Sequence, residues 1–291
     1  GEYRAAGYAV LRSPEDLASA PLDQRWAGVF SESHLPYNVD QLGGIAKVRE
    51  TPPLAAMTAA ALRKLQRSKN FILQVEGGRV DHACHSMDAA GAMREMISFD
   101  EAVEVCLSFQ REHPETLLVL TTDHGNGNPG LNGAGSGYRD SSKLLGNIRQ
   151  VRLSIGEIAK RIKAAKTTDD MAAALFEATG YKTDSARMEM LRPFIDGKGK
   201  ALYDAHKSDL AGLSEVLANY TGISFTSGAH TSDFVPILAY GPGADAFHGF
   251  VEGPDIFSRY TEFAGIRFRN PQEPLRLNAS ARTHDAARDM A

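Results

Sequence analysis

Ligand-type side chains gather directly after one short apolar run of the sequence. The run 70–75 leads into Glu76, Asp81 and His85, and His82 stands beside Asp81. Because Asp81 and His85 are four positions apart, a helical turn would place both on one face, where they can bind a single ion. Glu76, at the tip of the predicted strand, can then face a neighbouring ion.

A second apolar run ends in residues of the same kind. It is followed by the adjacent pair Asp123 and His124, and a further histidine, His230, precedes a third apolar run. Ligands of open α/β sheets bind at the carboxyl ends of strands, so neighbouring strand ends predict one shared pocket. Nitrogen and carboxylate ligands suit zinc, whereas an all-oxygen contribution such as that of Glu76 suits magnesium.

Each of these residues also has an ordinary structural explanation. A single His or Asp at the end of a strand is more often a turn or capping residue than a metal ligand. Six such residues, each beside an apolar strand, seldom occur together by chance. The set, rather than any one member, therefore predicts a metal site.

The elements that would position these residues follow from the spacing of apolar side chains. Short apolar runs alternate with amphipathic segments, a pattern typical of strands and helices in an α/β fold. We expect three layers, α/β/α, around a mostly parallel central sheet. The predicted strands are 7–11, 26–30, 70–75, 116–122 and 234–240, and the predicted helices are 13–20, 53–67 and 87–113, the last with a break near Ser98.

The segment 141–221 differs from the rest because its pattern is helical throughout. Helix starts are predicted at a capping box from Ser154 to Glu157, at Thr168 and at Thr183. We expect this segment to be a helical insertion within one domain that comprises residues 1–291. The end of that domain, residues 270–291, is expected to be loosely ordered because it is rich in polar and charged residues.

Composition and charge exclude several classes of protein. The net charge is −4 over 291 residues, which gives no basic footprint for nucleic acid. Two cysteines are too few for a disulfide framework. No run of about 18 apolar residues occurs, so no membrane-spanning helix is expected. A small anionic substrate would have to be held by local cations or metals.

The segments around the ligand-type residues resemble those of alkaline phosphatases. The resemblance lies in Glu76–His85, in Thr121–His124, and in Ala229–Thr231 followed by Ala239–Pro242. It covers about residues 7–265 and implies hydrolysis of phosphate monoesters by two-zinc, in-line phosphoryl transfer through a phosphoserine intermediate. It also implies a homodimer of the complete protein and a periplasmic or secreted location.

The same resemblance implies a role for each ligand-type residue. Asp81, His85 and His230 would bind the first zinc, and Asp123 and His124 the second. Glu76 would bind one magnesium ion. His82 stands at a position where family members have Lys or His in contact with the phosphate.

Some parts of the family site have no counterpart among these residues. In the family, the serine nucleophile, an Asp that bridges the second zinc and magnesium, and an Arg that clamps phosphate all precede the Glu76 motif. Only 75 residues precede it here, so we expect an N-terminally truncated, C-terminal portion of the fold, with the nucleophile outside this chain. Ser185 and Ser19 stand in similar motifs but fit helix positions better. A non-catalytic metal-binding fragment and a phosphodiesterase-like or sulfatase-like relative remain alternatives.

Overall fold

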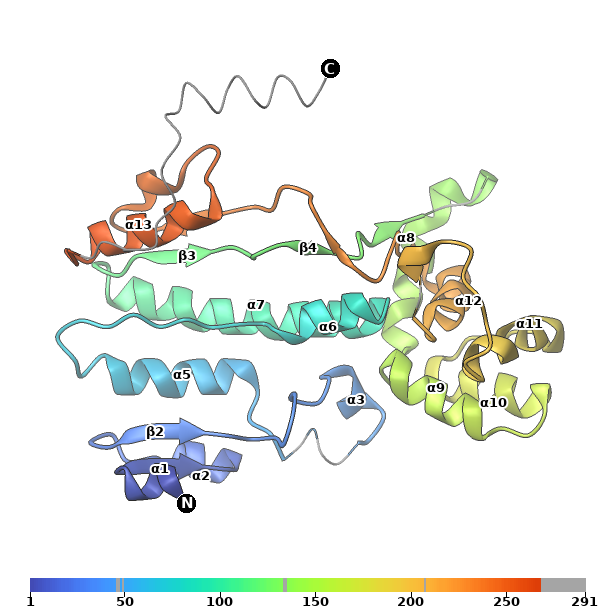
Figure 1. The fold of residues 1–291 in the computed structure, drawn as a ribbon, viewed down its shortest axis with the longest axis horizontal. Coiled ribbons are helices and arrows are strands. Elements are labelled where there is room, and N and C mark those ends of the chain that lie inside the picture. The colour runs from blue at the N-terminus through green and yellow to red at the C-terminus, as the bar shows by residue number, and fades with distance from the viewer. Residues whose placement is uncertain (46–47, 49, 133–134, 207, 268–291) are drawn as a thin grey trace.

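The fold was analysed in a computed structural model that describes residues 1–45, 48, 50–132, 135–206 and 208–267. The expected loose end, 270–291, lies outside the described residues. Figure 1 shows the helices α8 to α12 gathered at one end of the molecule. The rest of the chain forms rows of helices and extended segments that run side by side.

The N-terminal rows contain a parallel pair of strands. Strand β1 (Tyr8–Leu11) pairs with β2 (Arg25–Gly28), and α2 (Pro14–Ala18) connects them. Helix α2 begins where predicted, because the Ser13 hydroxyl accepts a hydrogen bond from the Asp16 N–H and Pro occupies the first helical position. The core of this part contains Leu11, Leu17, Ala20 and Ala60.

The middle rows of Figure 1 consist of three helices. They are α5 (Leu54–Leu65), α6 (Arg79–His85) and α7 (Ala89–Glu112). The predicted break near Ser98 is wrong, because α7 continues through that residue. Ser98 is buried within the helix, and no Pro interrupts the run. A single small polar residue is too weak a signal to end a helix that is held by packing on both sides.

The segment 70–75 is extended but does not form the predicted strand. It pairs with no other strand among the described residues. Its apolar side chains still alternate, because Phe71 contacts Phe109 of α7 with ring centroids 6.0 Å apart, whereas Ile72 is 71% exposed. The prediction of a strand at 70–75 is therefore wrong, and the side chains of this segment alternate between α7 and solvent.

Short antiparallel pairs make up the remaining strands. They are β3 (Leu118–Leu120) with β8 (Leu238–Tyr240), β4 (Gly125–Asn126) with β7 (His230–Thr231), and β5 (Gly130–Leu131) with β6 (Ile223–Ser224). The structure is thus a helix-rich α/β fold, and a mostly parallel central sheet is not confirmed. Strand β8 begins later than predicted, after Pro236, which lacks the N–H that a ladder requires.

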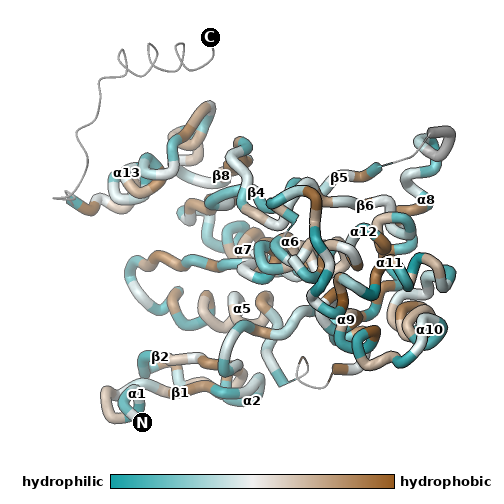
Figure 2. Tube along the Cα trace, turned by 45° about the vertical axis from the view of Figure 1, so that its right-hand side comes forward, coloured by the Kyte–Doolittle hydropathy of each residue, from teal (hydrophilic) through white to brown (hydrophobic). Residues whose placement is uncertain are grey.

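Helices fill the segment 141–221, as predicted. They are α8 (Ser141–Gly146), η2 (Asn147–Gln150), α9 (Ile155–Ala164), α10 (Thr168–Thr179), α11 (Ser185–Ile195), η3 (Asp204–His206) and α12 (Ala211–Thr221). Their apolar faces meet in the largest core cluster, and Figure 2 shows hydrophobic stretches gathered there. That this segment is an insertion within one domain stays a prediction.

The helix starts of this segment differ in detail from the prediction. The box predicted at Ser154 does not form: its hydroxyl donates to Asp40 instead. A capping box does form at α10, where Thr167 and Asp170 bond to each other's backbone N–H. Helix α11 is capped by the carboxylate of Asp184. The predicted starts are thus each within one residue of the observed caps, and at Ser154 a distant partner, Asp40, replaces the local capping bond.

Two buried carboxylates join the helical segment 141–221 to the part of the chain that precedes it. Asp88, at the N-terminus of α7, accepts hydrogen bonds of 2.8 Å from the N–H groups of Gly91 and Ile155. Asp40 accepts 2.6 Å and 3.1 Å bonds from the N–H and hydroxyl of Ser154. Burial raises the pKa of Asp88 to about 6, against the lowering effect of its N–H partners. The start of α9 is thus held by two acidic side chains.

The remaining elements lie toward the two ends of the described chain or connect the elements above. No described helix is long and apolar enough to cross a membrane. The remaining bounds are α1 (Glu2–Ala5), α3 (Val39–Leu42), η1 (Gly135–Asp140), η4 (Ala244–Phe247) and α13 (Gly253–Phe263).

Candidate metal centre

Helix α6 presents two of the predicted ligands on one face. Asp81 and His85 stand four positions apart in this helix, and their Oδ2 and Nε2 atoms are 3.4 Å apart. The helix begins directly after the glycine pair that follows Glu76. The expectation that one turn would bring Asp81 and His85 together is met by this geometry.

The short β4–β7 ladder brings a third ligand from far along the chain. It pairs Asn126 with His230. Gly127, directly after β4, has a φ of +66°, and a Cβ there would lie 2.9 Å from the Phe225 ring and 3.0 Å from the Ser227 carbonyl oxygen. Only glycine fits this close approach without strain. The ladder therefore sets where His230 enters the site.

Asp81, His85 and His230 place possible metal-ligand atoms close together. His230 Nε2 lies 3.5 Å from Asp81 Oδ1 and 3.1 Å from His85 Nε2. The 3.4 Å contact between Asp81 and His85 is made by the other carboxylate oxygen, Oδ2. Zinc bonds of about 2.0–2.2 Å in a tetrahedron require ligand atoms about 3.3–3.6 Å apart. Both contacts of Asp81 fall within this range and the contact between the two histidines is slightly shorter, so the three residues lie close enough to hold one metal ion.

Two further contacts orient these ligands. The Gly228 carbonyl oxygen lies 2.8 Å from His85 Nδ1, which must then carry the proton, so that Nε2 is left with a free lone pair. The Asn126 side-chain amide donates to Asp81 Oδ1 at 2.6 Å and to the Asp81 backbone carbonyl at 3.2 Å. Metal ligands in proteins are commonly held by such outer hydrogen bonds.

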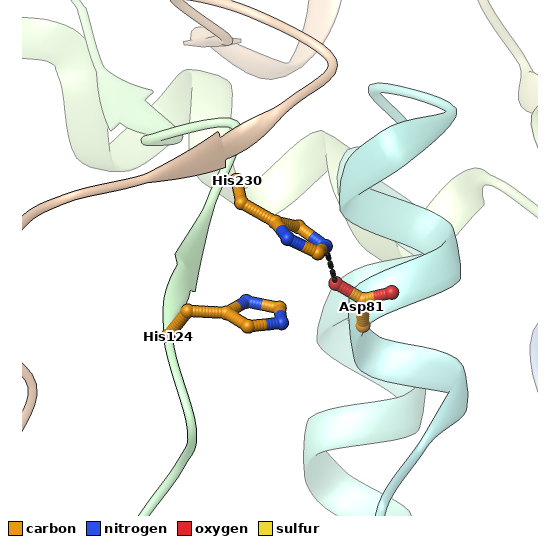
Figure 3. Close-up of side chains that lie close together, drawn as sticks. All are labelled: Asp81, His124 and His230. Atoms are coloured by element: carbon orange, nitrogen blue, oxygen red, sulfur yellow. Dashed lines mark ion pairs between the residues drawn. The ribbon is translucent and has the colours of Figure 1, made fainter. Parts of the chain in front are cut away.

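Asp123 and His124 extend the cluster on the strand side. Their Oδ2 and Nε2 atoms are 3.2 Å apart, and the His124 ring stacks on that of His230 with centroids separated by 3.5 Å. One ligand atom from each of Asp81, His124 and His230 lies within 4.8 Å of the others. Figure 3 shows these three side chains converging from α6 and from the β4 and β7 segments. The side chain of Asp123 is 82% exposed.

Glu76 lies apart from this cluster. It is exposed and lines the same cleft as Asp81, Asp123, His124 and His230. The cleft has a volume of about 2830 Å³ and is bounded by the extended segment 70–75 on one side and β3 on another. The structure thus places Glu76 on the shared cleft but not among the clustered ligands, and its magnesium role stays a prediction.

Comparison with known proteins identifies the family. A profile described as "Alkaline phosphatase" matches residues 1–266. The chain belongs to the alkaline phosphatase family. Alkaline phosphatase 3 of Bacillus subtilis (strain 168) is 31% identical over 272 residues, which cover 88% of this chain and 52% of the relative. Streptomycin-6-phosphate phosphatase of Streptomyces griseus is 34% identical over 145 residues, or 42% of this chain and 32% of that protein.

Solved structures of alkaline phosphatases have the same fold. The crystal structure of Thermus thermophilus alkaline phosphatase superposes with a TM-score of 0.83 at 30% identity, covering 93% of this chain and 59% of that one. A cold-active alkaline phosphatase from Shewanella sp. gives 0.73 at 28% identity, with 90% and 60% covered. The chain spans about half the length of the B. subtilis relative, which is 52% covered.

In this alkaline phosphatase family member, His82 lies in a group of cationic and aromatic side chains. Arg79 Nη1 is 2.9 Å from His82 Nδ1, and the ring of His34 lies 4.2 Å from that of His82. Burial lowers the pKa of His82, and His34 and Arg79 lower it further. Sequence reasoning missed Arg79, although its position three residues before His82 on a helix is a usable signal.

The thiol of Cys84 and the two serines in nucleophile-like motifs have structural explanations. Cys84 is buried, and burial raises the pKa of its thiol to about 11, as expected of a packed structural cysteine. Ser185 begins α11 and donates to Asp169 at 2.6 Å. Ser19 ends α2 and donates to the Glu15 carbonyl at 2.8 Å. Neither serine lies in the elements that carry the ligand cluster.

Proposed function

We propose that this chain carries the metal centre of a phosphomonoester hydrolase that works with two zinc ions and one magnesium ion. Asp81, His85 and His230 would hold the first zinc. Asp123 and His124 would contribute to the second, and Glu76 to magnesium. The observation that supports this most directly is the convergence of Asp81, His85 and His230, whose carboxylate oxygens and Nε2 atoms make mutual contacts of 3.1–3.5 Å.

The chemistry follows from where these residues lie. When bound, the zinc pair supplies Lewis-acid stabilisation of the charge that develops on the transferring phosphoryl group. Asp81 and Asp123 contribute negative charge that offsets that of the ions. Asn126 and the Gly228 carbonyl fix the orientation of Asp81 and His85, so that little reorganisation is needed when a substrate arrives.

Phosphate monoesters are the proposed substrate class. Family membership supports it, and so does the similarity to a protein named for its action on streptomycin-6-phosphate. Turnover, a homodimer and a periplasmic or secreted location are proposals for the whole protein. We assign the serine nucleophile to none of the 291 residues and propose that turnover depends on a polypeptide that supplies it.

Zinc binding by the chain is the first test. Isothermal titration is expected to show tight zinc uptake that His85→Ala or His230→Ala abolishes, whereas His248→Ala, at a histidine outside the cleft, leaves it unchanged. Equal zinc affinity in all four proteins would reject the assigned centre. A polypeptide that also contains the nucleophile is expected to hydrolyse a chromogenic phosphate monoester, to stop with a chelator, and to recover with zinc and magnesium.

A further inference from the structure

Arg79 and His82 form a hydrogen bond whose direction is fixed by chemistry. Arg79 Nη1 and His82 Nδ1 are 2.9 Å apart on consecutive turns of α6. A guanidinium only donates, so Nδ1 of His82 must accept. The neutral ring therefore carries its proton on Nε2. A nitrogen that bears a proton has no lone pair for a metal, and Nδ1 is already in use.

The guanidinium of Arg79 is itself packed against the ring of Tyr37. Its guanidinium carbon lies 3.6 Å from the centroid of the Tyr37 ring, within the range of a cation–π contact. Its Nε is buried and has no hydrogen-bond partner among the described residues. The side chain thus keeps a position that leaves one of its own donors unpaired while another reaches His82. Buried unpaired donors are rare in proteins and call for an explanation.

A second ring lies against that of His82. The ring of His34 lies against it at 4.2 Å between centroids, tilted by 56°. His34, Arg79 and His82 all line the cleft that contains Asp81, Asp123 and His124. A ring held between Arg79 and His34 has one polar atom left for a ligand, its Nε2–H. Such a donor matches an acceptor oxygen and not a cation.

We propose that Arg79 is a positioning residue that fixes His82 as an Nε2–H donor toward an oxyanion in the cleft. The inference deepens the proposed function and rests on it for the identity of the oxyanion, a phosphoryl oxygen. It also explains why His82, adjacent to the ligand Asp81, is not a ligand itself. A purely structural role for Arg79, as a packing partner of Tyr37, would leave the tautomer of His82 unspecified.

Nuclear magnetic resonance of the whole chain labelled with ¹⁵N-histidine tests the tautomer directly. At about pH 8.5 an ordinary imidazole is neutral, and two-bond ¹H–¹⁵N correlations show which ring nitrogen carries the proton. Wild-type His82 is expected in the Nε2–H form. In Arg79→Met, which keeps a long apolar stem but has no donor, the preference for that form is expected to fall by at least about tenfold, as for loss of a charge-assisted hydrogen bond.

The matched control removes a similar arginine elsewhere. Arg25 lies over the ring of Tyr8 at 4.5 Å in the β1–β2 pair, so Arg25→Met removes a cation–π contact without touching His82. Its His82 signals are expected to match the wild type. An Nδ1–H form in the wild type overturns the proposal even if Arg79→Met fails to fold. An unchanged tautomer in a folded Arg79→Met overturns it as well.

Inorganic phosphate then tests the oxyanion. Zinc-loaded wild-type chain is expected to bind phosphate about tenfold more tightly than zinc-loaded Arg79→Met, with the largest shift at His82 Nε2, because one oriented donor is lost. Equal affinities would overturn the link between Arg79 and the oxyanion. Absence of phosphate binding in both proteins would contradict the proposed function, and the tautomer measurement would still decide whether Arg79 sets the ring of His82.

Discussion

The carboxylate of Asp88 accepts a 2.8 Å hydrogen bond from the backbone N–H of Ile155, which lies 67 positions further along the chain. The same carboxylate caps α7 through the N–H of Gly91. One buried side chain therefore satisfies the starts of two helices that belong to different parts of the molecule. The free N–H groups at a helix start are otherwise left without partners when they are buried.

Removing this carboxylate is expected to destabilise the protein strongly. Asp88→Ala leaves the N–H groups of Gly91 and Ile155 buried without an acceptor, at a cost of about 1–3 kcal/mol for each. Urea denaturation should show a total loss of about 2–6 kcal/mol in the free energy of unfolding. Asp184→Ala, which removes an exposed cap from α11, is the control and should cost about 1 kcal/mol. Equal losses in the two variants would contradict the proposed double role.

Asp88 also predicts a dependence of stability on pH. Its pKa is about 6 in the folded chain, above the ordinary value of 3.8, so the folded state holds this proton more tightly than the unfolded state. Unfolding then releases a proton between about pH 4 and pH 6, and the contribution of this group falls as pH rises across that window. Above about pH 6 the stabilising contribution of the Asp88 proton is fully lost.

The comparison with Asp88→Asn isolates this effect from other titrating groups. The variant lacks the titration, so its deficit relative to the wild type should narrow by about 2–3 kcal/mol between pH 4 and pH 7. Urea denaturation at several pH values measures both proteins. A deficit that stays constant across the window would show that Asp88 does not titrate there.

Asn126 provides a prediction about the metal centre that does not change any proposed ligand. Its amide donates to Asp81 Oδ1 at 2.6 Å and orients that carboxylate. Asn126→Ala is expected to weaken zinc binding by about 10–100-fold, the usual effect of losing an outer hydrogen bond. Isothermal titration measures it, and Asn219→Ala, which removes an amide that caps carbonyls within α12, should leave zinc affinity unchanged.

Gly127 is expected to tolerate no side chain. Its φ of +66° and the 2.9 Å approach of the Phe225 ring to a Cβ predict that Gly127→Ala costs about 1–3 kcal/mol and displaces the β4–β7 ladder. Zinc affinity should fall with it, because His230 enters from that ladder. Gly156→Ala in α9, where a Cβ meets nothing within 4 Å, should instead stabilise by up to about 1 kcal/mol. Thermal unfolding and zinc titration distinguish the two.

Much of the candidate site was predictable from the sequence because its signals are local. Asp81 and His85 share a helix, so their spacing predicts their contact. Asp123 and His124 are neighbours, so their contact needs no knowledge of the fold. His230 required more, because only the ladder between Asn126 and His230 shows how a residue so far along the chain returns to α6.

The fold was less predictable where pairing depends on residues distant in sequence. The apolar run 70–75 led to the prediction of a strand, but the run could not reveal whether a neighbouring strand would supply hydrogen bonds, and the segment packs Phe71 on α7 without a strand partner among the described residues. Ser154 and Glu157 match a capping box in letters, but Asp40 offered Ser154 a better buried partner. The same limit hid the contact of Arg79 with Tyr37, which lies in a distant segment, whereas the contact of Arg79 with His82 on the same helix was readable from the sequence.

The contact between His85 and His230 also links metal binding to the folding of the chain. His85 and His230 are 145 positions apart, and one ion held by both would act as a cross-link that closes a loop of that length. The unfolded chain could bind the ion through both histidines only by closing this long loop at a cost in conformational entropy, so the ion would bind the folded state preferentially. The helices α8 to α12 lie inside this loop, so zinc would tie their folding to that of α6, and the unfolding temperature would rise with zinc concentration.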